Sequence, residues 1–358
     1  MLSKLLTLNE KIEWSNLIDK LPIDQQDIYY TPDYYELCER NGDGEAMCFV
    51  YEGDGDIAMY PFLLNSVNRL GYELDKEYFD IQGVYGYNGA LFSSCSAKFL
   101  KDFSQSLLNY CREHNVITEF TRFNPILKNH VYAKYLSVVK MNKNIIVDLT
   151  NTEENIWNSL YDHSVRKNVR KAHRSRLTTT IFNNSQITDK WLNDFKRIYY
   201  DTLKRNQAEN YYYFDDDYFL NITKLLKYNG IFFFVLKDNK PISCELVTYK
   251  NNKAYSFLGG TLSEYFPYRP NDLLKHEIIL HLKNIGVEYF CLGGGTSKND
   301  GIFKYKKSFS KNGDVNFYIG ETIYNHKIYD YVCKKWTEKY PDISNKFSNR
   351  LLKYREII

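Results

Sequence analysis

Along the second half of the chain, hydrophobic residues are spaced alternately as in a strand and as in a helix. Residues 178–182 are rich in β-branched side chains, which is typical of a strand, and residues 189–205 carry apolar residues at helical spacing. A second helix is expected at residues 215–228. The turn sequences KDNKP and KNNK follow, and they favour hairpins because they combine Asn, Asp and Pro. The strands predicted around these turns are 231–236, 242–249 and 254–259.

The rest of this half continues the alternation of strands and helices. A helix is expected to begin near Asn271 and to end at Gly286, because glycine commonly terminates helices. The other predicted elements are a strand at residues 288–292, a glycine run at 293–295, a short helix at 301–309 and a strand at 315–319. The predicted order is therefore β-α-α-β-β-β-α-β-α-β.

The first half repeats this order less distinctly. Its predicted elements are helices at residues 11–20, 32–40 and 97–113, and strands at 46–51, 57–63, 117–120 and 145–149. Two copies of one α/β fold are therefore expected, each with a mixed sheet flanked by helices. We place an N-terminal domain at residues 1–150 and a C-terminal domain at 151–358, because 358 residues suit two domains of ordinary size.

The composition narrows the classes of protein to consider. A net charge of +3 is nearly neutral, so any basic surface must be local, and DNA is not expected as a partner. No stretch approaches the ~20 apolar residues that cross a bilayer, and the N-terminus lacks a signal-peptide pattern. The seven cysteines are scattered without a CxxC pair, as in a reduced protein without disulfides. A soluble cytoplasmic protein is therefore predicted.

The histidines do not indicate a metal site. His276 and Glu277 begin an HExxH-like pattern, but Leu280 stands where the second histidine would be needed. No metal is predicted. The chain also lacks a GxSxG elbow, a Walker loop and a dinucleotide fingerprint.

One strand–loop–helix junction is suited to a phosphate group. Its strand ends in glycines and its helix begins soon afterwards, so backbone N–H groups and the positive end of the helix dipole would attract an anion. Arg269 could add a bidentate contact. The alternative is an ordinary connection, because the usual glycine spacing of a phosphate loop is absent. The residues of this candidate site are Gly259, Gly260, Thr261, Arg269, Asn271, Asp272 and Leu273.

A basic stripe follows one face of a predicted helix. Arg166, Arg170 and Arg174 are four residues apart, with Lys167 and Lys171 beside them. Such a stripe could hold the diphosphate of a nucleotide-linked acceptor or the backbone of a tRNA. The alternative is a solvated helix face.

Four charged residues are candidates for chemistry. Glu245 lies in an otherwise apolar strand, where a partly desolvated carboxylate would suit general base catalysis; the alternative is a salt-bridged strand residue. Lys304 and Lys306 flank Tyr305 and could stabilise an oxyanion or a donor phosphate, or they could be solvated lysines. Asp80 is a second candidate base.

Several stretches carry a family resemblance. Residues 292–309, in which a glycine run precedes the sequence FKYKKSF, resemble the C-terminal signature of the FemABX-like aminoacyl transferases. Residues 79–89, 119–125 and 166–171 are similar to other FemABX stretches and occur in the same order. The predicted element order also resembles the GNAT acyltransferase fold. The resemblance covers nearly the whole chain.

The resemblance implies a tandem GNAT fold and an N-acyltransferase. The co-substrate would be acyl-CoA or aminoacyl-tRNA, bound at the glycine-containing junction, and the acceptor an amine of a cell-envelope precursor, either a peptide or an amino sugar. An oriented amine would attack directly, without a covalent intermediate. A lipid-linked precursor would bring peripheral contact with a membrane. The long coiled-coil arm of FemA and FemB is missing, which puts tRNA docking of that form in doubt.

The acceptor cleft implied by the resemblance involves both predicted domains. Its residues are Tyr85, Tyr87, Asn88, Arg122, Arg166 and Arg170. The alternative function is a catalytically silent GNAT relative that binds a nucleotide sugar or a partner enzyme.

Overall fold

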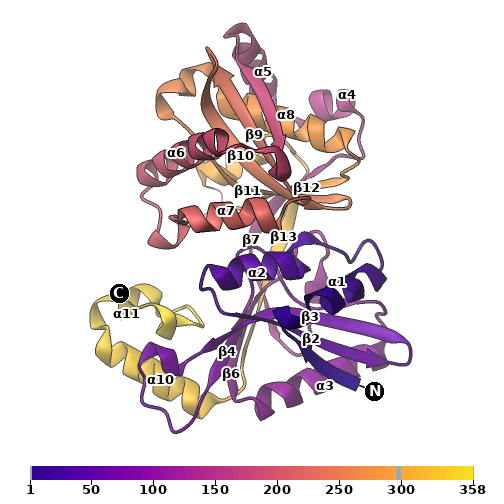
Figure 1. The fold of residues 1–358 in the computed structure, drawn as a ribbon, viewed down its shortest axis with the longest axis vertical. Coiled ribbons are helices and arrows are strands. Elements are labelled where there is room, and N and C mark those ends of the chain that lie inside the picture. Colours follow the sequence, from indigo (N-terminus) through magenta and orange to yellow (C-terminus); the bar gives the residue numbers. More distant parts are fainter. Residues whose placement is uncertain (1, 296–299, 358) are drawn as a thin grey trace. The chain divides into compact units, whose positions relative to one another are not determined.

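The chain forms two compact units in the computed structural model, which describes residues 2–295 and 300–357 (Figure 1). The first unit comprises Met1–Met141 and Phe317–Ile358, and the second comprises Asn142–Asn316. The sequence predicted one boundary near residue 150. The units instead have two boundaries, because the C-terminal segment returns to the first unit.

Buried aromatic residues hold the C-terminal segment in the first unit. Tyr329, Trp336 and Tyr354 join a cluster with Val67 and Ile117, in which Trp336 is only 1% exposed. Burial of large aromatic side chains supplies much of the free energy of folding. The sequence analysis predicted no helix or strand beyond residue 319 and placed this segment in the C-terminal domain, whereas the structure places it in the first unit.

The first unit contains a sheet with helices on its faces. Its strands, in order across the sheet, are β1 (Leu2–Leu6), β2 (Glu45–Gly53), β3 (Asp56–Ser66), β4 (Phe79–Gln82), β6 (Val116–Arg122) and part of β13 (Asp314–Ile323), with β5 (Leu91–Phe92) beside β3. Its helices are α1 (Lys11–Lys20), α2 (Pro32–Arg40), α3 (Ala97–Glu113), α10 (His326–Lys339) and α11 (Pro341–Phe347). Strands β4 and β6 are parallel, and the other neighbours along the sheet are antiparallel.

The second unit has a sheet with the same pattern of directions. Its strands, in order, are β8 (Thr178–Asn183), β9 (Gly230–Lys237), β10 (Lys240–Lys250), β11 (Lys253–Thr261), β12 (Tyr289–Gly293) and part of β7 (Ser137–Asp148). Its helices are α4 (Glu153–Asn155), α5 (His163–Arg174), α6 (Asp189–Arg205), α7 (Asp216–Leu225), α8 (Pro270–Asn284) and α9 (Gly301–Lys307). Strands β11 and β12 are parallel, and the other neighbours are antiparallel.

The sixth strand of each unit comes from the other half of the sequence. β7 begins in the first unit, but its residues 145–148 pair with β12 of the second. β13 begins in the second unit, and its residues 319–323 pair with β6 of the first. Each unit is therefore completed by a strand that the other half of the chain supplies.

Helices cover both faces of the second sheet. Consecutive residues of β10 point to opposite faces: Cys244 donates to the carbonyl of Phe195 in α6 at 3.8 Å, whereas Glu245 contacts Lys275 of α8. Figure 1 shows α6 and α7 on one side of β9–β11 and α8 with α5 on the other. The side chain of Glu245 therefore lies on the side of the sheet that α8 covers.

The predicted tandem α/β fold with mixed sheets is confirmed. The strands predicted at 231–236, 242–249 and 254–259 correspond to β9, β10 and β11. The helix predicted to stop at Gly286 ends at Asn284, and Gly286 has φ +87°, a left-handed conformation that glycine adopts easily. A short π-helix at Ile156–Leu160 was not predicted. No helix in residues 2–295 and 300–357 has the length and apolar content needed to cross a membrane.

A buried carboxylate lies in the core of the first unit. Glu119 of β6 is 0% exposed and accepts hydrogen bonds from Tyr60 at 2.6 Å, Tyr324 at 2.5 Å and Thr121 at 3.2 Å. Burial raises the pKa of Glu119, and the three hydroxyl donors oppose this rise. The stability of the first unit is therefore linked to the protonation of Glu119.

Candidate active site

Strands β11 and β12 separate part of the way along. Their parallel pairing runs from Lys253 opposite Tyr289 to Tyr255 opposite Cys291, although β11 continues to Thr261. On its other side, β11 remains paired with β10 to its end. Within the described residues, the second half of β11 therefore has a strand neighbour on one side only. This separation is the first feature of the candidate site.

A buried ion pair lies beside this separation. Both oxygens of Glu245 accept hydrogen bonds from the Lys275 ammonium, at 2.5 and 2.6 Å, and Ser256 of β11 donates to one of them at 2.7 Å. Lys275 also lies 5.3 Å from the centre of the Phe290 ring on β12. The sequence proposed Glu245 as a base or as a salt-bridged residue, and the structure shows the salt bridge.

The second lysine of the site comes from α9. Lys306 is partly buried, and its ammonium donates to the carbonyl of Gly294 at 2.7 Å. Burial, and then the charge of Lys275, lowers the pKa of Lys306 to about 8, while Glu245 acts in the opposite direction. Lys306 is therefore a cation that can lose its proton close to neutral pH.

The two lysines proposed from the sequence are not equivalent. Lys304 is exposed, whereas Lys306 is partly buried and the charges of both Lys275 and Glu245 affect its pKa. Tyr305 between them donates to the carbonyl of Asn271 in α8 at 3.0 Å, which fixes α9 against α8. The structure therefore brings Glu245 and Lys306 together and leaves Lys304 at the surface.

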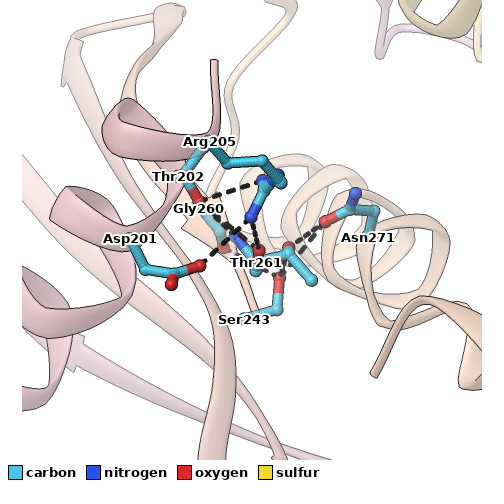
Figure 2. A network of polar contacts seen from close by, with 7 residues as sticks. All are labelled: Asp201, Thr202, Arg205, Ser243, Gly260, Thr261 and Asn271. Carbon is cyan, nitrogen blue, oxygen red and sulfur yellow. Dashed lines mark hydrogen bonds and ion pairs between the residues drawn. The ribbon is translucent and has the colours of Figure 1, made fainter. Parts of the chain in front are cut away.

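Polar contacts fill the junction between β11 and α8 (Figure 2). The backbone N–H of Thr261 donates to the Thr202 hydroxyl at 3.0 Å, and Arg205 donates to the Thr261 carbonyl at 3.0 Å. The Thr261 hydroxyl bonds with Ser243 at 2.5 Å and with the side-chain oxygen of Asn271. The polar groups of Thr261, proposed as a phosphate ligand, thus already have protein partners.

The two glycines at this junction allow close packing. A β-carbon on Gly260 would lie 2.5 Å from the Thr202 hydroxyl and 2.7 Å from the Ile198 carbonyl, both in α6. A β-carbon on Gly259 would lie 2.7 Å from the Cys244 carbonyl in β10. Close packing against α6 and β10 is therefore enough to explain why both positions are glycine.

The start of α8 combines charges of both signs. Arg269 is exposed and precedes the helix in a left-handed conformation, with φ +65°. Asp272 is 8% exposed and accepts a hydrogen bond from Asn168 of α5 at 3.2 Å, and burial raises its pKa. Leu273 is a core residue, 1% exposed. A phosphate group at this helix end would meet a carboxyl side chain as well as backbone N–H groups.

The basic stripe divides into residues with different roles. Arg166 donates to the carbonyls of Trp157 at 3.1 Å, Asn158 at 3.3 Å and Tyr161 at 2.6 Å, and so satisfies the end of the π-helix. Arg170 is exposed and lies over the Trp157 ring at 5.4 Å. Arg166 therefore stabilises the end of the π-helix, whereas Arg170 is exposed to solvent.

The other proposed acceptor residues lie in the first unit. Asn88 is 0% exposed, and its side-chain oxygen accepts the backbone N–H of Arg122 at 3.0 Å. The carbonyl of Tyr85 accepts the Tyr34 hydroxyl at 2.5 Å. Tyr87 is partly buried, and the Arg122 side chain is exposed. Asn88 therefore anchors its loop, and acceptor binding by this group stays a prediction.

Asp80 is an anchor for the C-terminal segment. It is 0% exposed and accepts hydrogen bonds from Tyr354 and Arg355, each at 2.7 Å. Burial raises its pKa, and the Arg355 charge opposes the rise. A substrate amine could not reach an enclosed carboxylate, so the proposed role of Asp80 as a base does not fit this environment.

The sequence analysis missed Lys275 and Ser256. Lys275 lies three, four and seven residues before Ile278, Ile279 and Leu282, which are all buried in α8. A lysine on the apolar stripe of a helix signals a buried, paired charge. That spacing could have identified Lys275, whereas Ser256 offers no comparable signal.

No metal-binding arrangement occurs among the described residues. In residues 2–295 and 300–357, no group of three or more His, Cys, Asp or Glu side chains is placed to hold a metal ion. All seven cysteines are free thiols.

Comparisons with known proteins agree with this architecture. The family model of the acetyltransferase (GNAT) domain matches residues 162–307, which include the ion pair and Lys306. No curated protein matches the sequence. The crystal structure of FemX has a TM-score of 0.67 at 14% identity, covering 92% of this chain and 99% of its own.

Two further solved structures share the fold. L-PGS from Bacillus licheniformis has a TM-score of 0.52 at 13% identity, covering 90% of this chain and 93% of its own. A tandem GNAT protein from the clavulanic acid biosynthesis pathway has a TM-score of 0.50 at 8% identity, covering 90% and 99%. Residues 162–307 therefore match the GNAT domain family, and the chain shares the fold of FemX over nearly its whole length.

Proposed function

We propose that the protein is an N-acyltransferase. It would move an acyl or aminoacyl group from a CoA thioester or an aminoacyl-tRNA to an amine of a cell-envelope precursor, either a peptide or an amino sugar. One observation carries the proposal: Lys306 lies beside the Glu245–Lys275 pair, where β11 and β12 separate, within the GNAT-matching segment. The class of acceptor rests on the FemABX resemblance of the sequence.

The proposed reaction is a direct displacement. The neutral amine of the acceptor attacks the donor carbonyl, an N–C bond forms, and the bond from carbon to the donor sulfur or oxygen breaks. The amine proton leaves with the departing thiol or hydroxyl. Negative charge develops on the carbonyl oxygen, and a cation aimed at that oxygen lowers the barrier.

Lys306 is the residue that we assign to this charge. Within residues 2–295 and 300–357, its ammonium donates to a neutral group, the carbonyl of Gly294. Lys275 is bound to both oxygens of Glu245. We therefore assign Glu245 and Lys275 a positioning role: their pair fixes the local charge beside Lys306 and holds α8 against β10.

The test is transfer by the purified chain. Acyl-CoA and charged-tRNA donors are offered with nucleotide-linked amino sugars and precursor peptides, and products are identified by mass spectrometry. Lys306→Met should lower kcat by about 10²–10³, as loss of one oxyanion donor does. Lys304→Met removes an exposed lysine from the same helix and should leave kcat within about 2-fold of wild type, because it removes no donor to the oxyanion.

Two outcomes would contradict the proposal. The first is that no combination of donor and acceptor gives a product. If the chain then binds a nucleotide sugar without any transfer, the binding-module alternative is favoured. The second is that Lys306→Met and Lys304→Met change kcat equally, which would remove Lys306 from the reaction.

A further inference from the structure

The second unit has an open sheet edge at β8. All six residues of β8 pair with β9 in one unbroken antiparallel register, and among the described residues no strand pairs with its other side. None of these six residues is buried, whereas seven of the eight residues of β9 are. The edge of β8 is therefore accessible to a partner.

The turn between β9 and β10 shows which backbone groups of β9 face β8. Asp238 and Asn239 form this turn, and both have positive φ, +50° and +62°, as in a two-residue type I′ turn. The residues that flank such a turn, here Lys237 and Lys240, form a hydrogen-bonded pair. Every second residue of β9, counted back from Lys237, therefore bonds towards β10, and the residues between them bond towards β8.

The same alternation assigns the backbone groups of β8. Thr178, Thr180 and Phe182 lie opposite the β9 residues that bond towards β8, so their N–H and C=O groups face β9. The N–H and C=O groups of Thr179 and Ile181 point away from the sheet. Within residues 2–295 and 300–357 these outward groups have no hydrogen-bond partner. An added strand would find two N–H donors and two C=O acceptors there.

β8 lacks the features that keep sheet edges unpaired. Edge strands commonly carry charged residues, proline or a bulge. β1, at the edge of the first sheet, follows this rule, because its Lys4 binds Glu13 at 2.7 Å and Glu52 at 3.0 Å. β8 has the sequence TTTIFN and a regular register, without charge, proline or bulge. The rings of Phe182 and Trp191 lie 4.9 Å apart, so packing against α6 also holds the strand in place.

The charge beside this edge is positive at one end. Arg174 and Arg176 precede β8 and are exposed, and in the described part of the chain neither has an acidic partner. Residues 183–188, at the other end of the strand, are uncharged. A partner strand with acidic residues beside Thr178 would therefore be favoured. A second copy of this chain, paired antiparallel through β8, would place its uncharged residues 183–188 there and would not supply those charges.

We infer that β8 binds an extended segment of a partner protein, which adds to the sheet as an antiparallel strand. The backbone groups of Thr179 and Ile181 provide the hydrogen bonds. Arg174 and Arg176 select acidic residues at the carboxyl end of the segment, which lies beside the start of β8. This interaction goes beyond the proposed function, because β9 and β10 lie between β8 and β11.

The test is peptide binding followed by fluorescence anisotropy with the full chain. The acidic probe is a fluorescein-labelled peptide in which alternating threonine and valine residues precede two aspartates, and a second probe carries two lysines in their place. Thr179→Pro removes an outward N–H and should weaken binding of the acidic probe about 10-fold, because a hydrogen bond is lost. Arg174→Gln/Arg176→Gln should weaken it about 2- to 30-fold, as the loss of two exposed charge pairs does.

Two controls separate binding from folding. Thr180→Pro removes an N–H that faces β9, so it should lower Tm, whereas Thr179→Pro should leave Tm close to that of the wild type. Lys101→Gln/Lys327→Gln removes the same charge as the arginine variant from exposed positions in α3 and α10. This control should bind the acidic probe as the wild type does.

Binding that is stronger for the acidic probe and that depends on Thr179 and the two arginines supports the inference. Equal binding of the two probes overturns it, as does full binding by Thr179→Pro. Equal loss of Tm in Thr179→Pro and Thr180→Pro also overturns it, because the assignment of the outward groups would be wrong. Sedimentation of the chain as a dimer that Thr179→Pro separates would show that a second copy occupies the edge, and this too overturns the inference.

Discussion

Replacing Lys275 by methionine isolates a negative charge inside the second unit. The side chains of Lys275 and Glu245 are only 6% and 10% exposed, and the ammonium lies 2.5 and 2.6 Å from the two carboxylate oxygens. Methionine has a similar volume but no charge. Removing one partner of a buried pair costs about 3–5 kcal/mol, because the other charge stays buried without compensation. The single hydrogen bond from Ser256 to Glu245 cannot replace an ion pair.

The assay is thermal denaturation followed by circular dichroism. For a unit of this size, 1 kcal/mol shifts Tm by about 2–4 °C, so Lys275→Met should lower the Tm of the second unit by about 6–20 °C. The double variant Glu245→Gln/Lys275→Met removes both charges. It should regain most of the loss, because neutral residues of similar volume are often as stable as the pair they replace.

An exposed ion pair provides the control. Lys98 and Asp54 are 64% and 73% exposed and 2.7 Å apart, so water screens this pair and Lys98→Met should lower Tm far less than Lys275→Met does. The reasoning is refuted if Lys275→Met lowers Tm no more than Lys98→Met does. It is also refuted if the double variant is as unstable as Lys275→Met alone, since the cost would then not come from the isolated charge.

Three further predictions concern pH and packing. The pKa of Lys306 is lowered to about 8, so a transfer rate that depends on its ammonium should fall as pH rises through about 8. The rate of Lys306→Arg should stay constant over the same range, because arginine keeps its charge, and pH–rate profiles of the two proteins test this. Gly260→Ala should cost about 1–3 kcal/mol because its β-carbon would meet α6, whereas Gly301→Ala, with open space around it, should be neutral by Tm. Burial raises the pKa of Glu119 in the folded state above 4.5, so the folded state binds this proton more tightly than the unfolded state does. The free energy of unfolding should therefore fall as pH rises above 4.5. In Glu119→Gln, the Tm should depend less on pH over this range.

Local patterns in the sequence were enough to predict most elements of the second unit. β9, β10 and β11 are apolar, β-branched runs between turn sequences, so their positions depend on neighbouring residues alone. The exchange of β7 and β13 could not be predicted in this way. A strand pattern indicates which residues are extended, but it contains no information about which distant strand they pair with.

The candidate site was predictable to a similar degree. Glu245 was identified because a charged residue in an apolar strand needs a partner or a function, and Lys306 was identified because it flanks Tyr305 together with Lys304. Lys304 was proposed alongside Lys306, although residues two apart in a helix do not share a face, and the structure separates them. Asp80 was misjudged because its partners, Tyr354 and Arg355, are more than 270 residues away in the sequence.

The exchange of β7 and β13 determines the order in which the two units can complete their folding during synthesis. The second unit, Asn142–Asn316, has all of its residues once β13 begins to emerge from the ribosome. The first unit must wait for residues 319–323 of β13 and for the aromatic cluster of the C-terminal segment. Although domains usually fold in the order of synthesis, here the half of the protein that is made first is completed last. Its edge at β6 therefore remains open to chaperones, or to mispairing, until residues 319–323 of β13 have been made.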